Sequence, residues 1–208
     1  MISAKDALER LKRGNSEFVA STQDDNFQLS RSGRAQLPKD QNPFAIILGC
    51  SDARVPAEIV FNQGLGDLFV IRVAGNIVAP SQVGSVEFAA AKYDTPLVVV
   101  LGHTQCGAVL ATLDALQRPE ESQSRDLRSI VDRVRPSVEP LWQTELRNDL
   151  PTLVDHAVRA NVRKSVDHLR HGSALLERLI ETRGFAVVGA EYSLDTGVVK
   201  FFDTEGAG

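Results

Sequence analysis

Two short segments of the sequence combine the residue types that bind metal ions. Their candidate ligands are Cys50, Asp52, His103 and Cys106. Thiolate, carboxylate and imidazole groups are the usual zinc ligands in proteins, and thiolates favour zinc over magnesium or calcium. The chain has only these two cysteines, and it places both in these segments. The C-x-D and H-x-x-C pairs therefore predict a zinc site.

Each pair follows an apolar run that is typical of a buried strand. The first run is FAIIL at 44–48, and the second is LVVVL at 97–101. Near-continuous apolar runs suit strands of a parallel sheet that is covered on both faces. Open α/β sheets bind ligands at the carboxyl ends of such strands. We therefore expect the two pairs to meet across one crevice at that edge.

The rest of the pattern predicts an α/β fold. Strands are expected at 44–48, 68–73, 97–101, 185–192 and 198–202. Helical patterns cover 4–20, 83–93, 106–117, 125–148 and 152–183, with breaks at Pro136, Pro140 and Gly172. The LDTG turn before the last strand indicates a hairpin. We expect an open, mostly parallel four-stranded sheet with an antiparallel fifth edge strand, flanked by helices, plus an N-terminal helical arm.

Length and composition limit the class of protein. The 208 residues fit a single domain, 1–208, with a helical arm and connection at 1–43 and an α/β core at 44–208. The formal net charge of −4 argues against nucleic acid as a partner. No apolar run is long enough to span a membrane. The N-terminus lacks the apolar segment of a secretory signal, so we expect a cytoplasmic protein.

The segment 50–76, CSDARVPAEIVFNQGLGDLFVIRVAGN, together with GHTQCGAV at 102–109, resembles the β-class carbonic anhydrases. The signature of that family is C-x-[DS]-x-R followed by H-x-x-C. The resemblance implies that Cys50, His103 and Cys106 bind one Zn²⁺ per chain, and that Asp52 and Arg54 form a catalytic dyad. It also implies a closed state at low pH, in which Asp52 becomes the fourth ligand.

The reaction implied by the resemblance is the reversible hydration of carbon dioxide to bicarbonate and a proton, by attack of zinc-bound hydroxide. Two thiolates would cancel the formal charge of the metal, so this zinc would acidify its water less than an all-histidine site. Asp52 is suited to accept a hydrogen bond from the hydroxide. Arg54 can hold that carboxylate in a bidentate pair and keep it off the metal.

The resemblance also implies a substrate pocket that is shared between the subunits of a homodimer or homotetramer. Its substrate-binding residues would be Gln41, Phe69, Ala74, Phe88 and Gly107. The helix at 4–20 would wrap around the partner.

A regulatory bicarbonate site that occurs in one subgroup of the family uses a tryptophan three residues before the first cysteine. Here that position is Ile47, although Arg72 matches an arginine of the same site. The missing tryptophan groups the chain with the plant-type members and makes bicarbonate inhibition unexpected.

Three other functions remain open at this stage. The same scaffold could carry a hydrolase of carbonyl sulfide or carbon disulfide, with a different pocket. It could also carry a non-catalytic module that binds zinc or bicarbonate. Finally, Cys106 activated by His103 could be a thiol nucleophile, although no third group orients the pair. Metal content and carbon dioxide hydration would separate these functions.

Overall fold

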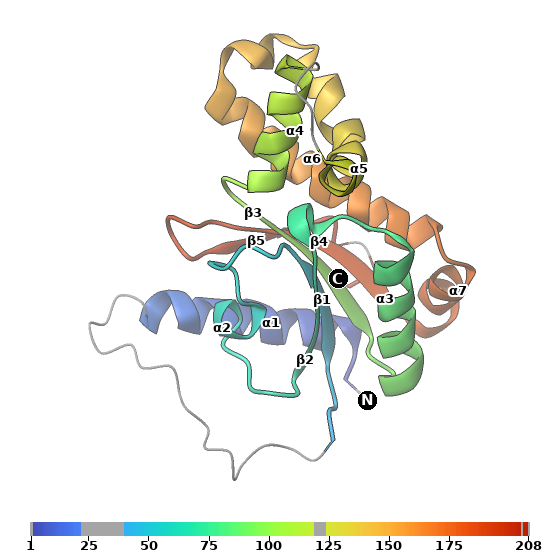
Figure 1. The fold of residues 1–208 in the computed structure, drawn as a ribbon. Helices are drawn as coiled ribbons and strands as arrows, with labels where there is room; N and C mark the ends of the chain where they lie inside the picture. The colour runs from blue at the N-terminus through green and yellow to red at the C-terminus, as the bar shows by residue number, and fades with distance from the viewer. Residues whose placement is uncertain (1, 22–39, 119–123, 205, 208) are drawn as a thin grey trace.

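The strands form one five-stranded sheet (Figure 1). The computed structural model describes residues 2–21, 40–118, 124–204 and 206–207. In the order of the sheet, the strands are β2 (Leu68–Arg72), β1 (Ala45–Gly49), β3 (Leu97–His103), β4 (Ala186–Tyr192) and β5 (Val199–Phe202). The first four are parallel, and β5 is an antiparallel edge strand beside β4. The predicted fold class is confirmed.

Helices cover both faces of this sheet. They are α1 (Ala4–Ser21), α2 (Ala57–Val60), α3 (Pro80–Tyr93), α4 (Gly107–Gln117), α5 (Arg125–Trp142), α6 (Leu150–His171) and α7 (Ala174–Arg183), with 3-10 turns η2 (Ala74–Asn76) and η3 (Glu145–Asn148). The first two pack on one face, and α3, α6 and α7 pack on the other. Helices α4 and α5 group with part of α6 beyond one end of the sheet (Figure 1). None of the helices in the described ranges is both long and apolar enough to cross a membrane.

The alternation of side chains along β1 explains why the sheet has two apolar faces. Ala45 and Ile47 face α1, whereas Ile46 and Leu48 face the opposite helices. All four are fully buried. Removing a large aliphatic side chain from water contributes about 1.5–3 kcal/mol. The continuous apolar run therefore reflects a strand covered on both sides, as the sequence predicted.

Helix α1 is docked on its own chain. A Cβ atom at Gly14 would lie 1.9 Å from a backbone oxygen after α2, so only glycine allows this approach. The buried Asn15 donates from Nδ2 to the carbonyls of Val60 and Gly197, and its Oδ1 accepts from the Val199 amide at 2.8 Å. The predicted arm is thus a packed helix. Most of the predicted connection at 21–43 lies outside the described residues.

Helix α5 continues through two prolines. The prediction that Pro136 and Pro140 break it is wrong. Both prolines are exposed, while Val134 and Val138 on the other side are buried. Each proline removes one helical hydrogen bond, and the freed carbonyl lies on the solvent side where water can replace the donor. The apolar face of the helix therefore stays intact.

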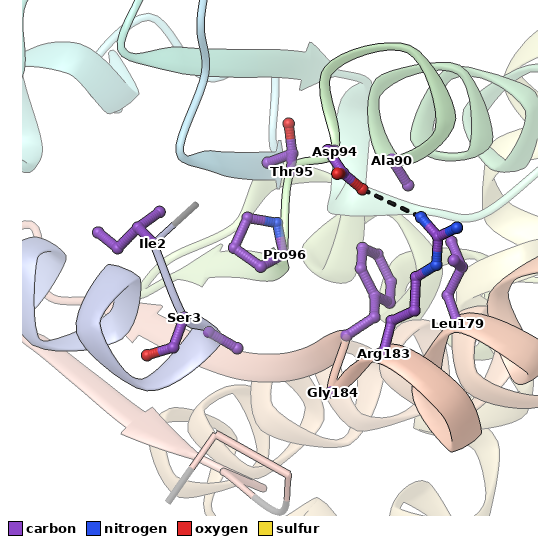
Figure 2. Close-up of a pocket in the computed structure, with 11 residues that line it drawn as sticks. Ile2, Ser3, Ala90, Asp94, Thr95, Pro96, Leu179, Arg183 and Gly184 are labelled. Carbon is purple, nitrogen blue, oxygen red and sulfur yellow. Dashed lines mark hydrogen bonds and ion pairs between the residues drawn. The ribbon is translucent and has the colours of Figure 1, made fainter.

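A cavity of about 580 Å³ lies at the opposite end of the sheet from α4 and α5. It opens between the start of α1 and the ends of α3 and α7, and an ion pair between Asp94 and Arg183 spans 3.2 Å beside it (Figure 2). Pro96 and Phe185, which precede β3 and β4, also line it. This end of the sheet holds the amino ends of the four parallel strands, and none of the predicted site residues lines the cavity.

Candidate metal centre

Three predicted ligands converge at the carboxyl end of the sheet. Strands β1 and β3 are parallel neighbours with Gly49 beside Leu101, so both strands end on the same side of the sheet. Cys50 follows β1, His103 ends β3, and Cys106 is the N-cap residue of α4. Their two sulfur atoms and one imidazole nitrogen lie within 4.8 Å of one another, and all three residues are buried.

The state of His103 suits a metal ligand. Its Nδ1 lies 2.9 Å from the carbonyl oxygen of Thr104, to which it can donate a hydrogen bond. That hydrogen bond favours the tautomer with an unprotonated Nε2. Nε2 is fully buried and has no hydrogen-bond partner among the described residues. An unsatisfied buried nitrogen is costly, and a bound metal ion would satisfy it. The residues therefore fit zinc, which prefers such sulfur and nitrogen ligands.

The two thiols differ in their affinity for protons. The hydrogen bond from Cys106 lowers the pKa of Cys50 to about 4; burial opposes this, and His103 and the backbone amides of Gly75 and Asp52 assist it. The same hydrogen bond, together with burial, raises the pKa of Cys106. The metal-free pair therefore holds one proton at neutral pH. Cys50 is already the thiolate that a metal requires.

Backbone amides supply further positive charge to the sulfur atoms. The Gly75 amide donates to Cys50 Sγ at 3.3 Å. The amides of Ala108 and Val109, in the first turn of α4, act on Cys106 and lower its pKa against the larger opposing effects. Unpaired amides at a helix N-terminus favour a nearby anion. These contacts prepare the site for two thiolates.

Asp52 is held by Arg54 beside the three ligands. Arg54 Nε lies 2.9 Å from Oδ1, Arg54 Nη2 lies 2.8 Å from Oδ2, and the Arg54 amide also donates to Oδ1. These hydrogen bonds hold the pKa of Asp52 well below its usual range. Oδ2 is 3.8 Å from His103 Nε2. The structure therefore has Asp52 directed to Arg54.

Arg72 at the end of β2 stabilises the segment that carries Cys50 and Asp52. Its Nε donates to the carbonyl of Cys50 at 3.0 Å, and its Nη2 donates to the carbonyl of Asp52 at 2.5 Å. The resemblance links this arginine only to a regulatory site. The structure shows that its guanidinium group binds the backbone of the segment that carries Cys50 and Asp52.

The predicted substrate-binding residues fall into two groups. Ala74 begins η2, the turn that contacts Cys50, and Gly107 begins α4 beside Cys106. No described atom outside its chain neighbours and its own helix lies within 4 Å of a Cβ placed on Gly107. This position thus has room beside the ligands.

Gln41, Phe69 and Phe88 gather elsewhere, around Tyr93. Gln41 Nε2 donates to the Tyr93 hydroxyl at 2.7 Å, and the three aromatic rings lie 5.9–6.3 Å apart. Phe69 pairs with Ile46, four residues before Cys50. At about 3.3 Å per residue, this separates it by roughly 13 Å along the strand from the metal ligands. Within one chain, this aromatic cluster is a separate feature.

Sequence reasoning missed the contribution of η2 and α6. The turn follows the carboxyl end of β2, so the rule that identified the ends of β1 and β3 would also have indicated Gly75. Asn161 and Ser165 are polar residues four positions apart on the apolar face of α6. Both donate to carbonyls of this turn. Two polar residues within the apolar face of the helix could have indicated that α6 forms hydrogen bonds to a buried segment.

Comparison with known proteins shows the family to which the chain belongs. Residues 45–199 match the family model described as carbonic anhydrase. The chain is 40% identical over 191 residues to carbonic anhydrase 2 of Mycobacterium tuberculosis, covering 92% of this chain and 89% of that protein. It is also 40% identical over 194 residues to carbonic anhydrase of Mycolicibacterium smegmatis, covering 93% and 91%.

The fold is shared with solved structures. The β-carbonic anhydrase CafA of Aspergillus fumigatus has a TM-score of 0.70 and 26% identity, covering 79% of this chain and 77% of that one. The fold is that of an α/β protein, and its Cys50–His103–Cys106 group could hold a metal ion. The chain belongs to the carbonic anhydrase family, in its β class.

Proposed function

We propose that this protein is a zinc enzyme that catalyses the reversible hydration of carbon dioxide to bicarbonate and a proton. The observation that carries this proposal is the buried Cys50–His103–Cys106 group beside the Asp52–Arg54 pair. A purely structural zinc site is closed by four protein ligands, whereas a catalytic site has three and keeps one position open. The three convergent ligands support the catalytic alternative.

Cys50, His103 and Cys106 would hold the zinc ion. Two thiolates and one neutral imidazole carry a total charge of −2, which matches the ion. When bound there, zinc would act as a Lewis acid that lowers the pKa of water and so provides a nucleophile for carbon dioxide at neutral pH. The valines and leucines that pack behind both cysteines keep water from that side of the site.

Asp52 and Arg54 would orient the reacting groups. Asp52 Oδ2 lies beside His103 Nε2 and remains ionised, so it can accept a hydrogen bond from the nucleophile and direct its lone pair. The bidentate contact from Arg54 fixes the carboxylate in this direction and opposes its movement onto the metal. Arg72 holds the backbone of the same segment, and so limits the movement of both Cys50 and Asp52.

We also propose a homodimer or homotetramer with a substrate pocket completed across subunits. Phe88 is 51% exposed, and β2 is an edge strand, so this side of the molecule is suited to contact a partner. Gln41, Phe69 and Phe88 of one subunit would then face the metal site of the other. Ala74 and Gly107 would line the same pocket from the subunit that binds the metal.

Stopped-flow measurement of carbon dioxide hydration, on protein with measured metal content, tests the proposal. We expect one zinc per chain and activity that disappears when zinc is removed and returns when it is restored. Hydrolysis of carbonyl sulfide should be measured in parallel. Turnover of carbonyl sulfide without hydration of carbon dioxide would overturn the proposal, as would full activity in protein that contains no metal.

A further inference from the structure

The Ala74–Asn76 turn links one metal ligand to helix α6. The Gly75 amide donates to Cys50 Sγ at 3.3 Å. The carbonyl of Gly75 accepts from Asn161 Nδ2 at 2.7 Å, and the carbonyl of Asn76 accepts from Ser165 Oγ at 2.9 Å. Both α6 side chains are almost completely buried, at 2% and 5% exposure.

We propose that Asn161, assisted by Ser165, is a positioning residue that holds the Gly75 amide against the metal-binding sulfur of Cys50. This inference rests on the proposed function only in taking Cys50 as a zinc ligand. Asn161 donates to the Gly75 carbonyl, so it acts on Cys50 through the turn. Hydrogen bonds to a metal-bound group orient that group and tune its charge, and their loss commonly weakens metal binding 10–100-fold.

The conformation of the turn explains why it needs this support. Gly75 has φ of +70° and Asn76 has φ of +43°, a region that few non-glycine residues adopt. The Asn76 amide closes the turn on the Val73 carbonyl at 3.0 Å. Because two successive carbonyls are anchored on α6, the Gly75 amide has little freedom to rotate away from Cys50.

The position of Asn161 on α6 argues against a role in packing alone. The neighbouring inward residues are Val158, Val162 and Val166, which pack on the sheet and behind the site. An apolar residue at 161 would fit that surface, whereas a buried amide is costly unless it is hydrogen-bonded. The Asn161 side chain donates to the Gly75 carbonyl, so the hydrogen bond that makes its burial tolerable is the one to the turn.

The experiment compares Asn161→Leu with Asn15→Leu. Leucine has the same branching and number of side-chain heavy atoms as asparagine. Asn15 is a buried residue on α1 that also donates to backbone carbonyls, those of Val60 and Gly197, so it controls for the larger size of leucine. Zinc affinity is measured by chelator competition on folded protein, and the thiolate-to-cobalt absorption band is recorded after substitution with Co²⁺. We expect Asn161→Leu to weaken zinc binding about 10–100-fold and to shift the cobalt band. Asn15→Leu should change neither.

Several results would decide against the inference. It is overturned if Asn161→Leu keeps the zinc affinity and the cobalt band of Asn15→Leu. If Asn161→Leu does not fold, Ser165→Ala loosens the same turn more mildly; at least threefold weaker zinc binding supports the inference, and unchanged affinity overturns it. Wild-type protein that binds no zinc would refute the proposed function itself, and the inference with it. The wild-type measurement therefore separates the two failures.

Discussion

Asp52 Oδ2 lies 2.8 Å from Arg54 Nη2 and 3.8 Å from His103 Nε2, so one carboxylate oxygen lies between the guanidinium group and the metal site. The bidentate contact with Arg54 holds the Asp52 carboxylate on the guanidinium group and away from the metal site. Arg54 has a side chain that is 56% exposed, whereas that of Asp52 is 17% exposed. Arg54 can therefore be substituted from the solvent side without disturbing buried packing.

Replacing Arg54 with alanine should release this carboxylate towards the metal ligands. We expect carbon dioxide hydration to fall about 10–100-fold, as for other outer contacts of metal sites. Arg54 lowers the pKa of Asp52, so its loss raises that pKa only towards the ordinary value of about 3.9. Asp52 would still be ionised at neutral pH, and the loss of activity would come from its movement. Stopped-flow assays between pH 6 and 9 measure the effect.

Arg54→Lys serves as the control for charge. Lysine keeps the positive charge but cannot form the bidentate contact. We expect it to recover only part of the lost activity. An Arg54→Ala enzyme with the wild-type rate and pH profile would show that the pair has no part in the reaction.

Replacing Gly75 with alanine should destabilise the protein. The new Cβ would lie 2.8 Å from Ala108 Cβ and 3.3 Å from Val134 Cγ2, in a backbone conformation that favours glycine. We expect a loss of about 2 kcal/mol, which lowers Tm by roughly 4–8 °C in a chain of this size. Calorimetry of the metal-free protein measures this without any contribution from zinc.

Gly84→Ala is the matched control. Gly84 lies inside α3, and a Cβ there meets no described atom within 4 Å. Alanine is favoured over glycine within a helix by about 0.5–1 kcal/mol, so stability should stay equal or rise. Equal effects of the two substitutions would contradict the close packing at the turn.

Much of the fold and the convergence of Cys50, His103 and Cys106 could be predicted from local patterns. The apolar runs before Cys50 and His103 identify buried parallel strands, and such strands end at a common edge. Because the ligands follow those ends directly, their convergence required no knowledge of the loops. The antiparallel β5 was also predictable, since its turn signal lies within the chain segment that forms the hairpin.

Contacts between distant segments could not be predicted in this way. Asn161 meets the Gly75 carbonyl across 86 residues, and nothing in the local pattern of α6 specifies its partner. Helix α5 shows a different limit. Local rules for Pro136 predict a break, but the exposed position of the proline lets the buried face hold the helix together. Tertiary packing decided both cases.

Charging the exposed aromatic cluster should separate the subunits. Phe88→Glu places a carboxylate where a partner would cover the ring, and we expect the dissociation constant of the dimer to rise at least about 30-fold, the effect of losing one strong interface contact. Activity should fall in parallel, because the partner completes the proposed pocket. Analytical ultracentrifugation measures the association. Leu127→Glu, at an exposed residue of α5, is the control. A monomeric wild-type protein with full activity would contradict the shared pocket.

Zinc binding should release a proton that comes mainly from Cys106. In the metal-free site the pKa of Cys50 is about 4, so it is already ionised at neutral pH, whereas the pKa of Cys106 is raised. Zinc requires both thiolates, so the proton on Cys106 must leave, and zinc affinity must rise with pH. Burial lowers the pKa of His103, but the contact and charge of Cys50, the Thr104 carbonyl and the charge of Asp52 together outweigh it, so this pKa is raised as well.

Calorimetric titration with zinc in two buffers of different ionisation enthalpy counts these protons. We expect about one proton per zinc at pH 8 and a larger number at pH 6, where His103 contributes, with affinity rising at least about tenfold per pH unit. In Cys106→Ser the thiol proton is absent, so zinc binding should weaken strongly and the release at pH 8 should fall. Two protons released at pH 8 would show that a second ligand, Cys50 or His103, is also protonated in the free site. Affinity that stays constant between pH 6 and 8 would exclude the shared proton altogether.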